Sequence, residues 1–138
     1  YYGTGSDIYV IDAATEKVIG NLGIAASEMC IDDDRLYTIS TEWSYTSSSN
    51  EVSYAVYDTA EQRIVSHNFI TDGTEKEISL PYGLAVNPET KEIFVCDATN
   101  YVTPGYLYCF TPEGTLKWKV RTGDIPAHIA FSSEPYYY

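Results

Sequence analysis

The side chains best suited to recognition are aromatic and amide groups in two stretches that are rich in polar, turn-forming residues. Trp43 and Tyr45 stand beside the Thr-Ser-Ser-Ser run at residues 46–49, and Asn100 and Tyr101 stand between two apolar runs. An exposed aromatic ring can stack on a sugar ring or on a peptide side chain while its polar end stays in water. These four residues are candidate ligand contacts. The alternative is that their rings only pack the loops onto neighbouring elements.

A second set of candidates stands at matching positions before three similar apolar runs. Glu28, Gly83 and His128 occupy these positions, and Tyr82 precedes Gly83. Polar groups that converge on one mouth of a fold can hold a ligand or a metal ion. We therefore add Glu28, Tyr82 and His128 to the candidate binding residues, with structural or solvated side chains as the alternative.

The motifs of common catalytic centres are missing from the sequence. It contains no GxSxG, HExxH or phosphate-binding glycine loop, and the sequence aligns no Ser-His-Asp triad. Three aspartates at residues 32–34 lack the spacing of a calcium loop and are expected to form a solvated turn. Cys30, Cys96 and Cys109 stand singly in apolar runs, where free cysteine commonly behaves as a small buried hydrophobe. We predict no catalytic residue, no metal ligand and no cofactor.

The charge balance excludes some classes of partner. The 138-residue chain has 8 basic and 20 acidic residues, which give a formal net charge of −12 and a pI near 4.3. Because phosphate binding depends on clustered Lys and Arg, nucleic acid and anionic membranes are poor partners for this surface. No apolar run approaches the length of about 20 residues that spans a bilayer. The net negative charge is expected to keep the protein soluble.

Two kinds of apolar run recur in the same order at intervals of about 50 residues. One kind ends in Asp or Thr, and the other follows a Pro or a small residue. The first kind comprises residues 8–12, 54–58 and 107–111, and the second comprises residues 29–32, 84–87 and 129–132. Such self-similarity indicates a structural repeat whose length varies in its loops.

Each repeat divides into four short strands, a to d, joined by turns that contain Asp, Asn, Pro or Gly. The inner runs are apolar on both faces, as expected for strands sandwiched between neighbouring sheets. The predicted fold class is all-β, with four-stranded antiparallel blades of a β-propeller. Within a single segment, 1–138, the blades are expected at residues 7–20 (partial), 28–70, 82–120 and 128–138 (the start of the next).

About two full blades with partial flanking blades fall short of the roughly four to eight that close a propeller. The chain is therefore expected to be a fragment of a larger propeller, with an oligomer that closes the ring between copies as the alternative. The b–c connections, residues 41–51 and 97–105, are expected to be long loops that emerge at the same end as the start of strand a. Long loops gathered at one end are a usual place for binding.

Parts of the repeat resemble a known family. Residues 81–88 and 93–100, PYGLAVNP and IFVCDATN, look like an NHL-type or YncE-like propeller repeat. The segment 122–131, TGDIPAHIAF, is similar to secreted YncE-like propeller lipoproteins of gut bacteria, whose function is mostly unassigned. The stretch 105–118 is also similar to a quinoprotein-type blade, but it occurs once only, so a quinone cofactor is not supported. The resemblance implies an exported or cell-envelope protein that binds or acts as a scaffold.

The favoured hypothesis is a non-catalytic binding or scaffold propeller of the bacterial cell envelope or exterior. Its partner would be a protein or a carbohydrate at the cell surface. One alternative is a metal-dependent propeller hydrolase or lyase, in which groups such as Glu28 and His128 hold an ion at the channel mouth. Another is a structural repeat that closes a ring by self-assembly.

Overall fold

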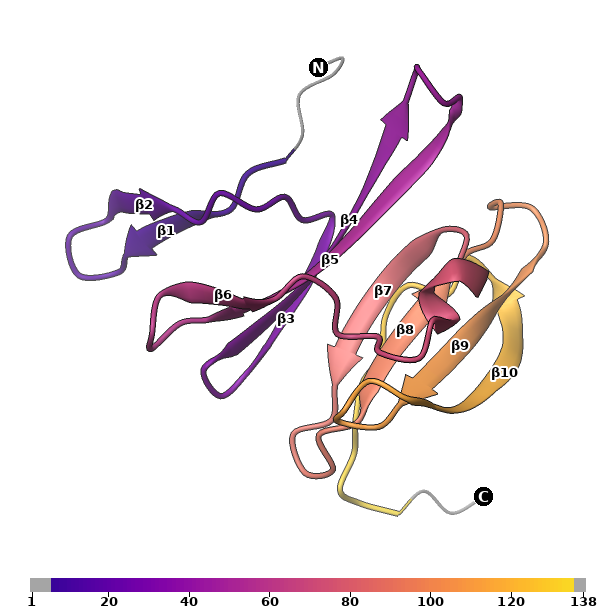
Figure 1. The fold of residues 1–138 in the computed structure, drawn as a ribbon. Coiled ribbons are helices and arrows are strands. Elements are labelled where there is room, and N and C mark those ends of the chain that lie inside the picture. The colour runs from indigo at the N-terminus through magenta and orange to yellow at the C-terminus, as the bar shows by residue number, and fades with distance from the viewer. Residues whose placement is uncertain (1–5, 136–138) are drawn as a thin grey trace. The chain divides into compact units, whose positions relative to one another are not determined.

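Short runs of β-branched and aromatic residues, separated by turn-forming residues, make ten β-strands in the described part of the chain. The structure is a computed structural model that describes residues 6–135 (Figure 1). The strands are β1 (Tyr9–Asp12), β2 (Lys17–Asn21), β3 (Glu28–Asp32), β4 (Arg35–Ser44), β5 (Ser49–Asp58), β6 (Arg63–Ser66), β7 (Pro81–Val86), β8 (Ile93–Asp97), β9 (Pro104–Phe110) and β10 (Leu116–Asp124). A short 3-10 turn, η1 (Thr74–Glu77), precedes β7. The predicted all-β class with four-stranded antiparallel sheets is confirmed.

The chain divides into two compact units, Tyr1–Phe69 and Ile70–Tyr138. The second unit is a four-stranded sheet in which each strand pairs with its neighbour in sequence, from β7 to β10. Val95, Tyr108 and Phe110 are buried on one face of this sheet. The segment before β7 reaches the same face, where the Glu77 carboxylate accepts a hydrogen bond from Lys119 Nζ at 3.1 Å. This ion pair raises the pKa of Lys119.

The chain that follows β10 crosses the opposite face of the sheet at two glycines. A Cβ added at Gly83 would lie 2.2 Å from the carbonyl oxygen of Ala127. One added at Gly105 would lie 2.6 Å from Cδ of Pro126. Only glycine has no Cβ, so these two positions allow the backbone to approach the sheet this closely.

The strand predicted at residues 129–132 is wrong for the described part of the chain. Residues 126–135 form no strand, because they have no hydrogen-bonded ladder with a neighbour. Instead, the Phe131 ring packs on Phe94 with centroids 5.3 Å apart. The predicted start of a further blade at 128–138 stays a prediction, and residues 136–138 lie outside the described range.

The first unit contains a complete sheet, β3-β4-β5-β6, and a separate hairpin of β1 and β2. Phe69 follows the complete sheet and is buried against it. Its ring meets the rings of Tyr37 and Tyr54 edge to face, with centroids 5.6 Å and 5.4 Å apart. These contacts close one side of the sheet with aromatic packing.

Burial of inner strands on both faces was expected and is found for β8, where Ile93, Val95 and Cys96 are buried. It is not found for the β1–β2 hairpin. The apolar side chains of this hairpin are more than half exposed at four positions: Tyr9, Ile11, Val18 and Ile19. The expectation fails here because, among residues 6–135, β1 and β2 pair only with each other, and a two-stranded ribbon buries little apolar surface.

The b–c connection expected as a long loop at residues 41–51 is instead a β-hairpin. Strands β4 and β5 stay paired from Arg35↔Asp58 as far as Ser44↔Ser49, which leaves a four-residue turn. The Ser-rich run predicts a flexible loop, but only its residues 46–48 lie in the turn, and Thr41, Glu42 and Trp43 before it are paired with β5. The second connection, between β8 and β9, is a loop as expected.

One turn motif recurs and explains why apolar runs end in Asp or Asn. Asp12, Asp58 and Asn87 each accept, through Oδ1, the backbone N–H groups two and three residues further on, at 2.8 to 3.3 Å. Such bonds let a short polar side chain close a turn. The residue four positions further on has a positive φ in each case: 55° at Glu16, 55° at Gln62 and 61° at Lys91.

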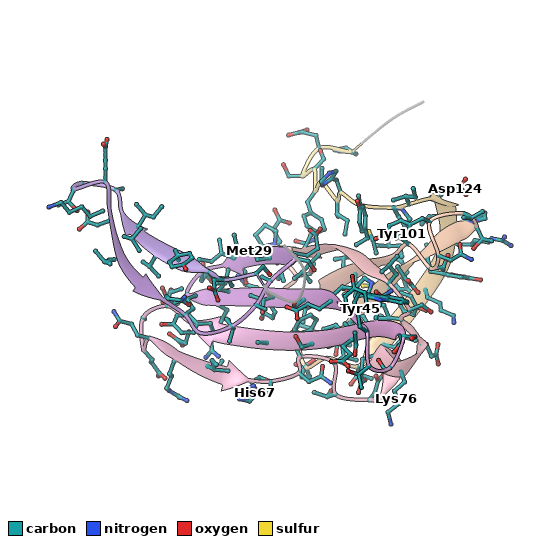
Figure 2. The ribbon with its side chains drawn as sticks, turned by 90° about the horizontal axis from the view of Figure 1, so that it is seen from above. Met29, Tyr45, His67, Lys76, Tyr101 and Asp124 are labelled. Atoms are coloured by element: carbon teal, nitrogen blue, oxygen red, sulfur yellow. The ribbon has the colours of Figure 1, made fainter. Side chains whose placement is uncertain are left out.

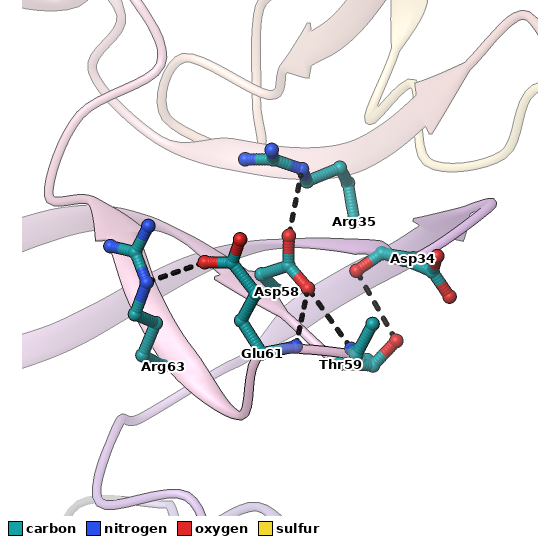
Figure 3. A network of polar contacts seen from close by, with 7 residues as sticks. Asp34, Arg35, Asp58, Thr59, Glu61 and Arg63 are labelled. Atoms are coloured by element: carbon teal, nitrogen blue, oxygen red, sulfur yellow. Dashed lines mark hydrogen bonds and ion pairs between the residues drawn. The ribbon is translucent and has the colours of Figure 1, made fainter.

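Among these three turns, the one at Asp58 has an additional ion pair to its carboxylate (Figure 3). This carboxylate accepts N–H bonds from Glu61 at 2.9 Å and from Ala60 at 3.0 Å, and Arg35 Nε lies 3.4 Å from its other oxygen. The Glu61 N–H, followed by that of Ala60 and by the charge of Arg35, holds the pKa of Asp58 below its usual value of 3.8, although burial opposes the shift. The charged form is therefore the one that the fold stabilises.

We predict a pH-dependent loss of stability in Asp58→Asn. The asparagine keeps an acceptor for the turn, as Asn87 does, but it loses the charge. Because the folded-state pKa of Asp58 is lowered, its stabilising contribution is complete above pH 3.8 and disappears as the pH falls through the folded value. Urea unfolding should show the wild type more stable than Asp58→Asn at pH 6, with the difference closing as the pH falls below 3.8 through the lowered folded-state pKa. Exposed Glu113→Gln controls for net charge, and a difference that does not change with pH would contradict this account.

Candidate functional site

The buried carboxylate of Asp97 ties together the two chain segments that carry the candidate residues of the second unit. Asp97 ends β8 and is 1% exposed. Its Oδ1 accepts N–H bonds from Leu80 and from Thr99, both at 2.9 Å, and its Oδ2 accepts one from Ser79 at 3.2 Å. Three donors satisfy the buried group. The entry to β7 and the loop after β8 are thus bound to the same side chain.

The loop after β8 is held in an unusual backbone conformation. Thr99 and Tyr101 have φ values of 56° and 65°, a region that branched and bulky residues rarely adopt. Asn100 Oδ1 accepts bonds from the N–H groups of Val102 and Thr103 at 3.0 and 2.9 Å, and from the Thr103 hydroxyl at 3.0 Å. Such conformations cost about 1–3 kcal/mol each and persist where their surroundings hold them. The side-chain bonds of Asn100 supply that restraint.

Tyr82 is aimed at this loop by a β-bulge. The register of β7 against β8 shifts between Pro81, which pairs with Asp97, and Gly83, which pairs with Cys96. A bulge inserts an extra residue and changes the direction of its side chain. Here the extra residue is Tyr82 (its ring meets Tyr101 edge to face, with centroids 5.5 Å apart and planes at 87°).

We call Tyr82 and Tyr101 the tyrosine pair. Their side chains are 37% and 50% exposed, and the neighbouring Val102 is 78% exposed. Neither phenol hydroxyl bonds to another residue within the described range 6–135. Figure 2 shows Tyr101 at the end of the sheet where β10 finishes at Asp124, which pairs with Pro104 beside the loop. The pair is a fixed aromatic surface with two hydroxyl groups open to a ligand.

His128 lies in the same unit but outside the tyrosine pair. It is exposed and directly follows Ala127, which crosses the sheet at Gly83. Within the described residues it makes no hydrogen bond or ring contact.

The other three candidates belong to the first unit. Trp43 on β4 is 54% exposed and stands opposite Asn50, and Tyr45 in the turn is 70% exposed. Glu28 begins β3, is half-buried and stands opposite Ile39. Trp43 and Tyr45 make no ring contact with another described residue, so no aromatic pair of the kind found at Tyr82 forms at this hairpin.

A second polar group in the second unit lies at the opposite end of the sheet from Asp97. Lys117 Nζ donates to Glu92 Oε2 at 2.8 Å, and Cys109 Sγ donates to the same oxygen at 3.4 Å. The bond from Lys117 is the main reason that the pKa of Glu92 is lowered. Burial raises the pKa of the Cys109 thiol to about 11, so the thiol stays protonated and is a poor nucleophile. An open hollow of about 360 Å³ lies beside this group, and Glu92 and Lys117 in its lining neutralise each other's charge.

No group of three or more His, Cys, Asp or Glu side chains that could hold a metal ion occurs among residues 6–135. Over the same range there is no helix long and apolar enough to cross a membrane. The three cysteines form no disulfide among the described residues; Cys96 and Cys109 are buried and Cys30 is only half-buried. The burial expected for Cys30 is therefore incomplete, because Cys30 lies on β3, an edge strand of its sheet.

Sequence reasoning missed two features of this site. Val102 is the most exposed of the large apolar side chains in the described residues, but one valine in a loop carries no signal by itself. Gly105 admits the Pro126 ring to the sheet, and a Pro-Gly pair at the start of a strand was the available hint. No model of a known protein family matches this chain, and no curated protein matches it.

We predict that Asp97→Ala destabilises the second unit by on the order of 3 kcal/mol, because three backbone N–H groups lose their acceptor in a buried place. Asp97→Asn keeps one acceptor oxygen, so its stability should lie between that of the wild type and that of Asp97→Ala. Chemical unfolding measures the loss, and two-dimensional NMR should show the largest shifts at residues 79–82 and 98–103. Exposed Asp124→Ala is the control. A loss in Asp97→Ala no larger than in the control would show that the carboxylate anchors nothing.

Proposed function

We propose that this chain is a non-catalytic binding or scaffold module, built from β-propeller blades, of the bacterial cell envelope or exterior. The binding part rests on one observation, the exposed tyrosine pair that a β-bulge and a positive-φ loop hold in place. Unusual backbone conformations cluster at functional sites, where they position side chains in advance. The location in the envelope rests on the resemblance of residues 122–131 to secreted propeller lipoproteins.

The absence of a catalytic role is supported by the chemistry of the groups described above. The Cys109 thiol has a raised pKa, and Glu92 is neutralised by Lys117. Asp97 accepts three backbone hydrogen bonds that join two chain segments, which is a structural use of the carboxylate. The tyrosine pair offers stacking surface and hydroxyl groups, which suit recognition.

The blade architecture is supported by the two complete sheets, which share strand number, strand order and antiparallel pairing. In both sheets the third strand pairs with the second, as β5 does with β4 and β9 with β8. The equivalent strand β1 pairs only with β2 among the described strands. The hairpin is then the outer half of a blade whose two inner strands come from elsewhere, either from further sequence or from a second copy.

We predict that the 138-residue chain self-associates, because the apolar side chains of the hairpin and of Met29 and Ile31 are exposed. The double variant Ile11→Lys and Val18→Glu places opposite charges at a paired position of the hairpin and should raise the monomer fraction. Sedimentation velocity measures the monomer fraction of the wild type and of the double variant. A stable wild-type monomer with a cooperative melt would argue against the open-blade account.

The binding role is tested by screening the immobilised full chain against glycan and peptide libraries. Ligands that bind should bind about tenfold more weakly to Tyr101→Ala, which removes the more exposed ring of the pair. Tyr9→Ala removes an exposed ring from the first unit that is not a candidate ligand contact and should leave binding unchanged. Equal binding to the wild type and Tyr101→Ala would place any binding elsewhere.

A further inference from the structure

The two stretches that bear the tyrosine pair carry no charged side chain, although the chain as a whole is strongly acidic. The two sequence stretches that bear the pair, residues 78–88 and 98–112, contain no Asp, Glu, Lys or Arg. The chain as a whole has a formal net charge of −12. A cationic ligand would find no carboxylate in these stretches, and an anionic one would find no basic group and a repelling surface. The absence of charge in these stretches favours a neutral ligand.

The polar groups at the pair are those that recognise hydroxyl groups. Asn100 Oδ1 is occupied by three hydrogen bonds from the loop, which sets the orientation of the amide. Its Nδ2 makes no hydrogen bond within the described residues and remains a donor. The hydroxyls of Tyr82 and Tyr101 can each donate and accept. One amide donor and two phenols beside an aromatic face can satisfy several hydroxyl groups of one ligand.

The apolar part of the site is an exposed aromatic ring beside an exposed valine. The edge-to-face contact with Tyr82 and the positive φ of Tyr101 restrain the Tyr101 ring. A rigid aromatic ring binds with a low cost in conformational entropy. A pyranose has an apolar face of C–H groups for such a ring and hydroxyl groups around its rim for the polar neighbours.

We infer that the tyrosine pair is a subsite for a neutral pyranose of a carbohydrate chain. The sugar ring stacks on Tyr101, next to Val102, while Asn100 Nδ2 and the phenol hydroxyls bond to its hydroxyl groups. This inference rests on the proposed binding function and specifies the ligand class of the same site. A peptide partner is less well matched, because the two stretches that bear the pair have no charged side chain to pair with a charged peptide.

The test is a titration of the isotopically labelled full chain with cellohexaose, xylohexaose, mannohexaose and maltohexaose, followed by two-dimensional NMR. At least one of these neutral oligosaccharides should produce saturable shifts centred on residues 82 and 99–103. Tyr101→Ala should weaken that binding about tenfold, and Tyr101→Phe should retain most of it because the stacking face remains. Tyr9→Ala, which removes an exposed ring of the first unit that is not a candidate ligand contact, is the matched aromatic control.

The outcomes separate this inference from the proposed function. No saturable shift with any of the four sugars, or equal binding by Tyr101→Ala, overturns the carbohydrate subsite. If a peptide selected from a displayed library then binds the wild type and loses affinity in Tyr101→Ala, the binding function stands with a different ligand. If neither class of ligand depends on Tyr101, the carbohydrate subsite and the binding role of the pair both fail.

Discussion

The arrangement of the candidate site depends on a single buried carboxylate. Asp97 accepts three backbone hydrogen bonds, from Ser79 and Leu80 on one side and from Thr99 on the other. A buried charge costs several kcal/mol unless its partners replace the water it loses, and here backbone donors do so. Because these donors flank the positions of Tyr82 and Tyr101, satisfying the carboxylate also sets the distance between the two segments. The position of the tyrosine pair thus follows from the hydrogen bonds of Asp97 at the end of β8.

The remainder of the second unit supports that end of the sheet from both faces. On one face Lys119 lies over the rings of Tyr106 and Tyr108, at 5.5 and 5.6 Å from their centroids, and pairs with Glu77. On the other face the chain after β10 crosses at Gly83 and Gly105. Packing on both faces restricts the strands that carry the site. The exposed side chains are left at the loop, where a ligand can reach them.

The repeat was predictable from sequence because its signals are local. A run of apolar residues ended by Asp12 or Asp58 predicts both a strand and the turn that the carboxylate closes. The tyrosine pair was not predictable as a pair, since it needs a bulge at Tyr82 and a positive φ at Tyr101, and neither leaves a local pattern. The extension of β4 and β5 was hidden by serines at residues 47–49, which resemble a flexible linker. The β1–β2 hairpin is exposed because it pairs with no third strand among the described residues, which no local pattern reveals.

The central claim is that the tyrosine pair is held in position before any ligand arrives. NMR relaxation and ring-proton NOE measurements on the unliganded chain test it most directly. The account predicts NOEs between the rings of Tyr82 and Tyr101, and backbone order parameters of about 0.85 at residues 98–103, as in rigid structure. Order parameters below about 0.6 with no NOE between the rings would mean that the loop samples many conformations. That result would contradict a site built in advance by Asp97 and Asn100.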